Sequence, residues 1–309
     1  MVRCMYLAAV AMLFVSLECA ANGTKVRIPR DARGVKLYVM ITPSHERYFN
    51  EWFRPTLQDE YELVVMRHEQ TRADGVYMRA GWTEAVLKKV DMIIGAIKNN
   101  WGTVFVYSDV DIQFFQPTWP VLSRDIGKYD MLAQGHRKNK PVICTGFFAC
   151  VGNERTLRTW QMVRQQMLDV MRKGSEIGDQ TGFKLVMWRN PAKLKLGVLP
   201  ASFMNGGGKL WMPGTSLLVP NGIVLHHANF VHSVDGKTQQ EVKIAQLAHV
   251  REQVNASPEL ISASAVGEVR PLKTTRSSRN APGHLFNRSH SLRSSMARSK
   301  LSSSAASRI

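Results

Sequence analysis

Cysteine is scarce in this sequence, which has four cysteines among 309 residues. No CxxC pair and no His/Cys cluster has the spacing of a structural zinc site. A chain of this length with 44% hydrophobic residues is neither a disulfide-stapled mini-protein, a collagen nor a wholly disordered polymer. Without the first 21 residues only Cys144 and Cys150 remain, and an extended strand would hold their sulfurs about 20 Å apart. We therefore predict two buried thiols.

Acidic residues are also few, with 24 Asp or Glu against 41 Lys or Arg and a formal net charge of +17. Residues 255–309 carry nine Lys or Arg, two Glu and fourteen Ser, which is +7 of this charge. Large apolar side chains are rare there, so burial cannot offset the entropy of ordering the chain. We predict a basic, Ser/Arg-rich disordered tail over residues 255–309. It is either a solvated extension or a segment that binds an anionic polymer or a membrane.

The apolar run from Met5 to Leu17 is too short to span a bilayer, which requires about 20 residues. Arg3 precedes the run and the small residues Ala20 and Ala21 follow it, a pattern typical of a cleaved signal peptide. We predict a signal peptide over residues 1–21 and a place in the secretory pathway, either in the Golgi lumen or outside the cell. An uncleaved segment would instead associate the chain with a membrane.

Strand-like and helical segments alternate between these two ends. Apolar residues at helical spacing predict helices from Trp82 to Ile97 and from Leu157 to Val170, the second preceded by the capping residue Asn153. Strands are predicted at residues 35–41, 61–66, 103–108, 129–133, 142–151, 217–219 and 223–225. The alternation indicates an α/β fold with a mostly parallel sheet. No internal repeat is visible.

Asp109 and Asp111 follow the strand predicted at residues 103–108 and precede a second apolar stretch. Two carboxylates at the end of a strand can both reach one hard cation, and strand ends are where α/β folds place their ligands. A solvated turn with two surface aspartates would show the same pattern. However, an unpaired carboxylate between two apolar runs is costly to bury, so we favour a metal site.

Four segments in order resemble the nucleotide-diphospho-sugar transferase family, and the similarity spans roughly residues 35–250. They are Val104–Pro117, Cys144-Thr-Gly-Phe-Phe148, Gly178-Asp-Gln180 and His226-His-Ala-Asn-Phe230. Members of this family include the plant rhamnogalacturonan xylosyltransferases, which have a GT-A fold. The resemblance implies a GT-A-like glycosyltransferase domain over residues 22–254, a nucleotide-diphosphate sugar as donor, and a glycan or glycoprotein as acceptor. The family often has Asn where this chain has Cys144.

The resemblance also implies a metal site. Asp111 would ligate Mn²⁺ or Mg²⁺, and Asp109 would reach the ribose or a metal-bound water. His227 matches the family's His-x-Asn-aromatic pattern and would be the third ligand, with His226 in reserve. Alternation along the preceding strand points the two imidazoles to opposite faces, so at most one should ligate. An imidazole beside two carboxylates favours Mn²⁺ over Mg²⁺.

Further site residues follow from the resemblance. Asp179 and Gln180 would lie beneath the transferred sugar and orient the acceptor, although Asp179 would also serve as a helix N-cap. Lys237 would contact a phosphate, although a lysine in a surface turn would show the same pattern, and Lys89 would lie on the donor side. The glycine-rich segment 205–209 lacks the spacing of a P-loop and is interpreted as an acceptor-side loop.

Three questions stay open in the sequence. The resemblance to α-xylosyltransferases favours retention of configuration, whereas an inverting enzyme would need a base such as Asp179 or Glu176. A secreted polyanion-binding protein and a haloacid-dehalogenase-like phosphatase are the alternative functions. The charge of +10 outside the tail suits a diphosphate donor, an acidic acceptor is a further hypothesis, and nucleic acid is not an expected partner.

Overall fold

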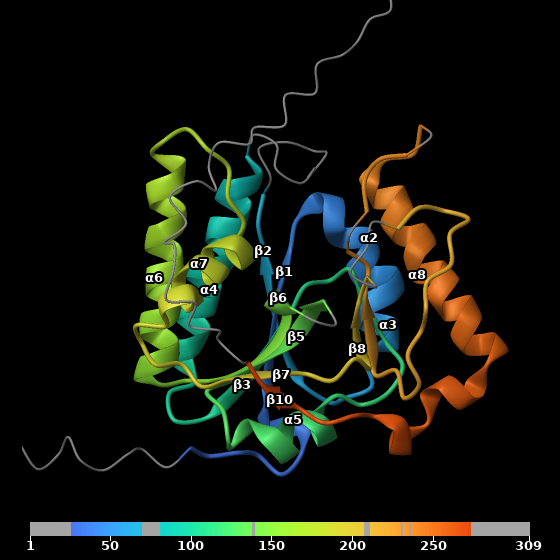
Figure 1. Cartoon of the computed structure of the whole chain (residues 1–309), viewed down its shortest axis with the longest axis horizontal. Coiled ribbons are helices and arrows are strands. Elements are labelled where there is room, and N and C mark those ends of the chain that lie inside the picture. Colours follow the sequence, from blue (N-terminus) through green and yellow to red (C-terminus); the bar gives the residue numbers. More distant parts are fainter. Residues whose placement is uncertain are drawn as a thin grey trace, which may run out of the picture. The chain divides into compact units, whose positions relative to one another are not determined.

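The computed structural model describes residues 26–69, 81–137, 140–206, 211–229, 231–234 and 236–272 (Figure 1). The predicted signal peptide and residues 273–309 of the predicted tail lie outside these ranges. Among the described residues, no helix combines the length and apolar character needed to cross a membrane.

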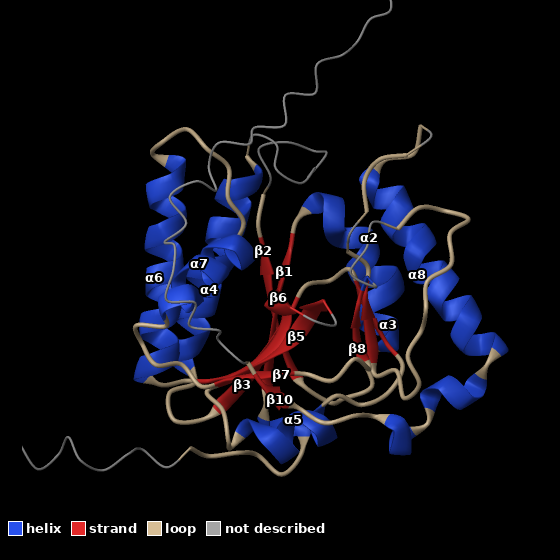
Figure 2. Ribbon diagram, in the orientation of Figure 1, coloured by secondary structure: helices blue, strands red, loops and turns tan. Residues whose placement is uncertain are grey.

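The central sheet has seven strands in the order β10-β7-β5-β6-β3-β1-β2 (Figure 2). Their bounds are β1 Lys36–Ile41, β2 Glu62–Arg67, β3 Val104–Ser108, β5 Met131–Arg137, β6 Lys140–Val151, β7 Leu196–Val198 and β10 Arg270–Pro271. Strand β1 is parallel to β2 and β3, whereas β6 is antiparallel to β3 and β5. Strand β7 is parallel to β5 and antiparallel to β10, so five of the seven strands point the same way. The predicted α/β fold with a mostly parallel sheet is confirmed.

A second sheet of three strands has the order β4-β9-β8, and its strands are β4 Ile112–Phe114, β8 Phe203–Asn205 and β9 Leu225–His227. Only residues 109–111 separate β3 in the large sheet from β4 in the small one. The backbone NH of Asp109 donates to the Gly146 carbonyl in β6 at 2.6 Å, and the NH of Ala228 donates to the Asp111 carbonyl at 2.9 Å. Backbone hydrogen bonds on both sides therefore fix the position of residues 109–111 between the two sheets.

Helices cover both faces of the large sheet. On one face lie α4 Trp82–Asn99, α6 Glu154–Met171 and α7 Asp179–Arg189, which share an apolar core with the sheet (Figure 1). On the other face lie the short helices α2 Glu46–Tyr48 and α3 Arg54–Thr56, the π-helical turn η4 Phe49–Phe53 between them, and α5 Trp119–Ile126. Helix α8, Gln239–Ala256, packs beside the small sheet. Short 3₁₀ turns complete the fold at η2 Ala32–Gly34, η3 Pro43–His45, η6 Pro258–Ile261 and η7 Ala263–Ala265.

A row of aromatic rings fixes α6 and α7 on the sheet. Tyr107 of β3 stacks on Phe148 of β6 with ring centroids 5.2 Å apart, and Phe148 stacks on Trp160 of α6 at 5.5 Å. Trp160 then contacts Phe183 of α7 at 5.3 Å. Aromatic contacts of this kind add to the energy of apolar burial. The row thereby sets the position of α7, whose first residue is Asp179.

The predicted helices and the capping role of Asn153 agree with the structure, in which Asn153 forms a capping box with Thr156. The two predicted buried thiols are also confirmed, because Cys144 and Cys150 are both free and buried. The strand predicted at residues 217–219 is wrong. Leu217 and Val219 are buried in a loop against the α8 core, and a short apolar run has the same pattern in a buried loop as in a strand.

The strand predicted at residues 223–225 starts later and forms β9, which includes both histidines. The domain boundary predicted after residue 254 falls inside α8, which ends at Ala256. Residues 257–272 then form η6, η7 and β10, and Val266 and Val269 pack against the core. This segment therefore belongs to the preceding domain and not to the tail.

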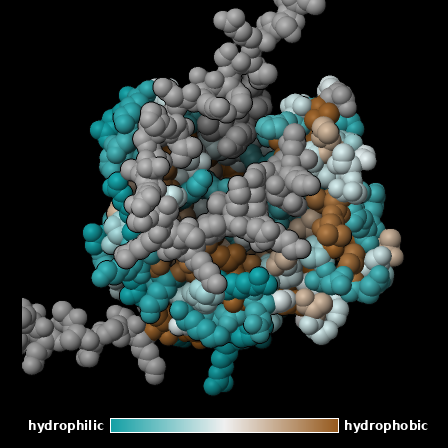
Figure 3. Space-filling model, in the orientation of Figure 1, coloured by the Kyte–Doolittle hydropathy of each residue, from teal (hydrophilic) through white to brown (hydrophobic). Residues whose placement is uncertain are grey.

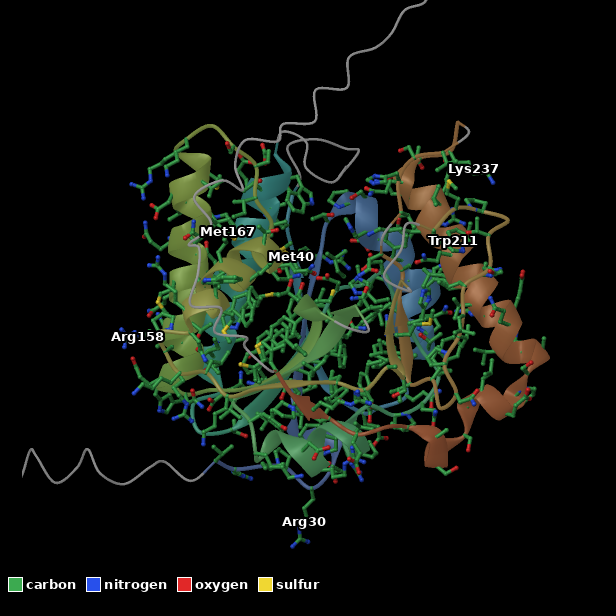
Figure 4. All side chains as sticks on the ribbon, in the orientation of Figure 1. Arg30, Met40, Arg158, Met167, Trp211 and Lys237 are labelled. Carbon is green, nitrogen blue, oxygen red and sulfur yellow. The ribbon has the colours of Figure 1, made fainter. Side chains whose placement is uncertain are left out.

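The loop at residues 211–219 carries apolar side chains on the molecular surface. Leu218 is 89% exposed and Met212 is 41% exposed. Figure 3 shows apolar surface on the side of α8 where this loop runs. Trp211, labelled on the same side in Figure 4, is itself buried in the core beside α8.

Candidate functional site

Asp109, Asp111 and His227 come together where the chain crosses between the two sheets. Each offers one ligand atom, and these atoms all lie within 4.8 Å of one another. His227 Nε2 is 3.2 Å from Asp111 Oδ1 and 3.9 Å from Asp109 Oδ2. Strand β9 brings His227 opposite Ile112 of β4. Ile112 is the residue that follows Asp111 in the chain. Two carboxylate oxygens and one imidazole nitrogen are a donor set that fits a divalent ion such as Mn²⁺.

Gly146 makes this approach possible. A Cβ atom built on Gly146 would lie 2.2 Å from His227 Cε1 and 2.8 Å from Asp109 Oδ2. Gly146 belongs to the Thr-Gly-Phe segment of β6, and its neighbour Phe147 is paired with Ser108 of β3. The glycine is required because the histidine ring and the carboxylate occupy the space of a side chain.

His227 is buried, and three side chains contact its second ring nitrogen. Its Nδ1 atom lies 3.3 Å from Gln134 Oε1, 3.5 Å from Asn229 Nδ2 and 3.6 Å from Cys144 Sγ. Burial alone would lower the pKa of His227, but the Asp111 carboxylate raises it, and the resulting pKa is about 10. The Cys144 thiol is one of these three contacts, and it occupies the position where the resemblance to the family would lead one to expect Asn.

Asp111 is held by two cationic or proton-donating neighbours. Besides His227, the ammonium group of Lys243 in α8 donates to Asp111 Oδ2. Burial would raise the pKa of the Asp111 carboxyl, but Lys243 and His227 hold it well below its usual range. Lys243 is a site residue that the sequence analysis missed. The capping box of Thr238 and Glu241 is a local signal for the start of α8, but no local pattern links Lys243 to Asp111.

Asp109 is joined to Asp179 through Lys89. The Lys89 ammonium is 2.9 Å from Asp109 Oδ1 and 2.9 Å from Asp179 Oδ2, and its side chain is 7% exposed. Burial would lower the pKa of Lys89, but the two carboxylates raise it well above its usual value. The Tyr107 hydroxyl also donates to Asp109 at 2.6 Å. Lys89, predicted on the donor side, thus forms a link between the two carboxylates.

Asp179 is the first residue of α7 and Gly178 is its N-cap, so Asp179 itself is not the cap. Gln180 follows it in the first turn of α7 and is partly exposed. Glu176, the alternative base, accepts a hydrogen bond from Thr83. Within the described residues, Lys89 thus links Asp179 to Asp109 of the carboxylate cluster.

Three other predicted residues lie apart from the cluster. His226 points to the opposite face of β9, where its Nδ1 atom is 3.2 Å from Gln113 Nε2. Burial, together with the neighbouring His227, lowers the pKa of His226 to about 3. Lys237 is exposed in the turn before α8, away from the strand ends (Figure 4). Asn205 is buried and donates to the Gly135 carbonyl, whereas residues 207–210 of the predicted acceptor loop lie outside the described residues.

The end of β1 forms the wall next to the aspartates. Thr42 and Ser44 contact His45 Nδ1 at 2.7 and 2.9 Å. Burial, together with the positive charge of Lys243, lowers the pKa of His45 to about 4. Because β1 and β3 are parallel neighbours, their ends lie at the same edge of the sheet. This edge thus combines hydroxyl groups, a neutral imidazole and a carboxylate cluster.

Three solved structures are similar to this chain at low identity. For mouse xyloside xylosyltransferase 1 in its apo form, the TM-score is 0.40 at 12% identity, over 63% of this chain and 97% of that chain. A glycosyltransferase involved in glycosylation of the major capsid of PBCV-1 has a TM-score of 0.43 at 11% identity, over 68% and 98%. The glycosyltransferase GlyE of Streptococcus pneumoniae TIGR4 has a TM-score of 0.36 at 12% identity, over 55% and 46%.

No curated protein sequence matches the chain significantly. The profile of the nucleotide-diphospho-sugar transferase family, however, matches residues 52–240, which is more than half of the chain. The matched range contains Asp109, Asp111, Asp179 and His227. The chain therefore belongs to the nucleotide-diphospho-sugar transferase family.

Proposed function

We propose that this transferase is a metal-dependent glycosyltransferase that moves a sugar from a nucleotide-diphosphate donor to a glycan or glycoprotein acceptor. The observation that carries the proposal is the cluster of Asp109, Asp111 and His227, whose ligand atoms lie within 4.8 Å of one another at the end of β3. Asp109 Oδ2, Asp111 Oδ1 and His227 Nε2 would hold the ion. A bound divalent ion supplies positive charge beside the diphosphate, where negative charge develops as the sugar departs.

Lys243 is the residue that we assign to the leaving diphosphate. Its ammonium group contacts Asp111 and its side chain is 19% exposed, so it lies at the edge of the cluster and not behind it. An ammonium group at this edge adds positive charge without any proton transfer. Lys243 takes the role that the sequence suggested for Lys237, which is exposed in the turn before α8.

On the other side of the cluster, the ammonium group of Lys89 forms ion pairs with the carboxylates of both Asp109 and Asp179. Asp179 is thereby kept at a fixed place beside the donor site, where it and Gln180 would orient the sugar and the acceptor. An ion-paired carboxylate in this position supports a retaining reaction, because inversion needs a free base beside the acceptor hydroxyl. We therefore propose retention of configuration at the transferred sugar.

The test is hydrolysis of a panel of UDP- and GDP-sugars by the full chain with Mn²⁺. We expect turnover of at least one donor, and Asp111→Asn should reduce it about 100-fold or more because one charged ligand is lost. Asp169→Asn is the matched control, since Asp169 is a half-exposed carboxylate that pairs with Arg172 on α6.

Full activity in Asp111→Asn would refute the site, and no turnover of any donor by the wild-type chain would contradict the proposed reaction. The NMR spectrum of the first product gives its anomeric configuration. A β-linked product from an α-linked donor would refute retention.

The place of action also remains a proposal. The predicted signal peptide supports the secretory pathway, with the Golgi lumen or the cell exterior as the site of action. The charge of +10 outside residues 255–309 supports an acidic glycan as acceptor.

A further inference from the structure

Gln134 of β5 lies behind the candidate metal ligands and is completely buried. It is opposite Cys144 of β6, at a break in the register of the two strands between Ala133 and Gln134. Such a break turns the local strand and redirects a side chain. Here it brings the amide of Gln134 between β8 and the ring of His227.

The orientation of the Gln134 amide follows from its partners on β8. Its Nε2 atom is 3.3 Å from the Phe203 carbonyl and 3.3 Å from the Met204 carbonyl. Backbone carbonyls only accept hydrogen bonds, so the NH₂ group of the amide must face them. The carbonyl oxygen of Gln134 must then face His227, where Oε1 is 3.3 Å from Nδ1.

An amide oxygen only accepts hydrogen bonds, so the His227 Nδ1 atom must carry a hydrogen. A metal ligand is a neutral imidazole, in which an ion takes the place of the second proton, and a hydrogen on Nδ1 then leaves the lone pair on Nε2. That atom is 3.2 Å from Asp111 Oδ1 and 3.9 Å from Asp109 Oδ2. Nε2 is therefore the ring nitrogen at the point where the two carboxylates converge, and it would offer its lone pair to an ion bound there.

Two other groups near Nδ1 do not replace this contact. The amide nitrogen of Asn229 is 3.5 Å away and only donates, and it also points to the sulfur of Cys144. The Cys144 sulfur lies at 3.6 Å and is a weak acceptor. The Gln134 oxygen is thus the strongest acceptor among the described side chains that contact this nitrogen.

We propose that Gln134 is a positioning residue that fixes the tautomer and the ring orientation of His227, so that Nε2 is the metal-binding nitrogen. This inference rests on the metal site of the proposed function. Hydrogen bonds from outside a metal's ligands commonly orient a histidine in this way, and their removal weakens metal binding.

The experiment measures Mn²⁺ affinity of the full chain by the EPR signal of free Mn²⁺. Gln134→Met keeps the size of the side chain and removes the acceptor, and we expect about tenfold or greater loss of affinity. The matched control is Gln113→Met, because Gln113 is an equally buried glutamine that contacts His226 on the opposite face. We expect the control to bind Mn²⁺ as the wild type does.

A second measurement needs no variant and therefore does not depend on the folding of Gln134→Met. In the wild-type chain labelled with ¹⁵N-histidine and loaded with Zn²⁺ as a diamagnetic probe, NMR should show a protonated Nδ1 and a metal-bound Nε2 for His227. A bound Nδ1 or a protonated Nε2 would overturn the inference.

The outcomes separate this inference from the proposed function. Wild-type Mn²⁺ binding with equal affinities for Gln134→Met and Gln113→Met would refute the role of Gln134 and leave the metal site standing. No Mn²⁺ binding by the wild type would refute both.

Discussion

At the scale of single residues, Gly146 shows how closely the backbone approaches the site. A Cβ atom at this position would lie within 3 Å of both His227 and Asp109. We expect Gly146→Ala to displace these two side chains and to weaken Mn²⁺ binding about tenfold or more, measured by EPR titration.

Gly95→Ala is the control for this substitution. Gly95 lies in α4, where an added Cβ meets nothing within 4 Å. Because alanine is the better helix former, we expect Gly95→Ala to bind Mn²⁺ normally and to gain about 0.5–1 kcal/mol in the free energy of unfolding. Undiminished Mn²⁺ affinity in Gly146→Ala would contradict the close packing at the site.

The sequence predicts some residues of the site and misses others for a physical reason. Asp109 and Asp111 lie at the end of a recognisable strand, and His227 belongs to a recognisable motif. Lys243 and Gln134 reach the cluster only through long-range packing, from a helix and from a strand with a break in register. Such contacts leave no pattern in the sequence around the residues that make them.

At the scale of elements, the pleat of β9 separates two adjacent histidines. His227 faces the aspartates, whereas His226 faces Gln113 and is completely buried. The sequence predicts this alternation because a strand directs successive side chains to opposite faces. The same strand therefore holds two imidazoles in very different electrostatic surroundings.

Burial lowers the pKa of His226 from 6.5 to about 3, with a smaller effect of His227. Between these pH values the unfolded chain binds a proton that the folded chain does not, so stability falls as the pH decreases. From pH 7 to pH 5 we expect this residue to lower the free energy of unfolding by about 2 kcal/mol. Urea unfolding of the wild type and His226→Gln at both pH values checks this.

We expect the free energy of unfolding of His226→Gln to depend less on pH than that of the wild type. His232→Gln serves as the control, because His232 is exposed and its removal should leave the dependence of the wild type. Equal pH dependence in the wild type and His226→Gln would disprove the burial of a neutral imidazole at this position.

The elements that the sequence predicts best are those with a clear apolar period, which are β1, β3, β6, α4 and α6. Helix α8 lacks a clear apolar period because Gln246 is buried beside Leu247 and Val250. The strands β4 and β8 have only three residues each, too few for a period to appear. Their pairing with β9 depends on residues far away in the chain.

At the scale of the whole molecule, residues 257–272 complete the domain. The Leu260 carbonyl accepts from the Ile223 backbone NH at 3.0 Å, and the Leu272 NH donates to the Leu196 carbonyl at 3.0 Å. Val266 and Val269 pack against the main core, and β10 adds an edge strand beside β7. Composition taken over residues 255–309 favours a tail because the stretch carries fourteen Ser and nine Lys or Arg, but only three of these Ser and one Arg lie before residue 273.

We expect a chain that ends at residue 254 to be less stable than one that ends at residue 272. The loss should be on the order of 3 kcal/mol, because half-buried apolar side chains and the edge strand disappear together. Thermal unfolding monitored by circular dichroism measures the difference. Equal melting temperatures would show that residues 257–272 contribute nothing to the domain.

The three-residue crossing between the sheets has a consequence for the order of folding. Backbone hydrogen bonds join Asp109 to Gly146 in the large sheet and Asp111 to Ala228 beside the small one. Contacts between partners so distant in sequence form late, since they must first overcome the entropy of closing long loops. The cluster is therefore complete only after both sheets have assembled, and an ion that binds there selectively stabilises the fully folded chain over its partly folded forms.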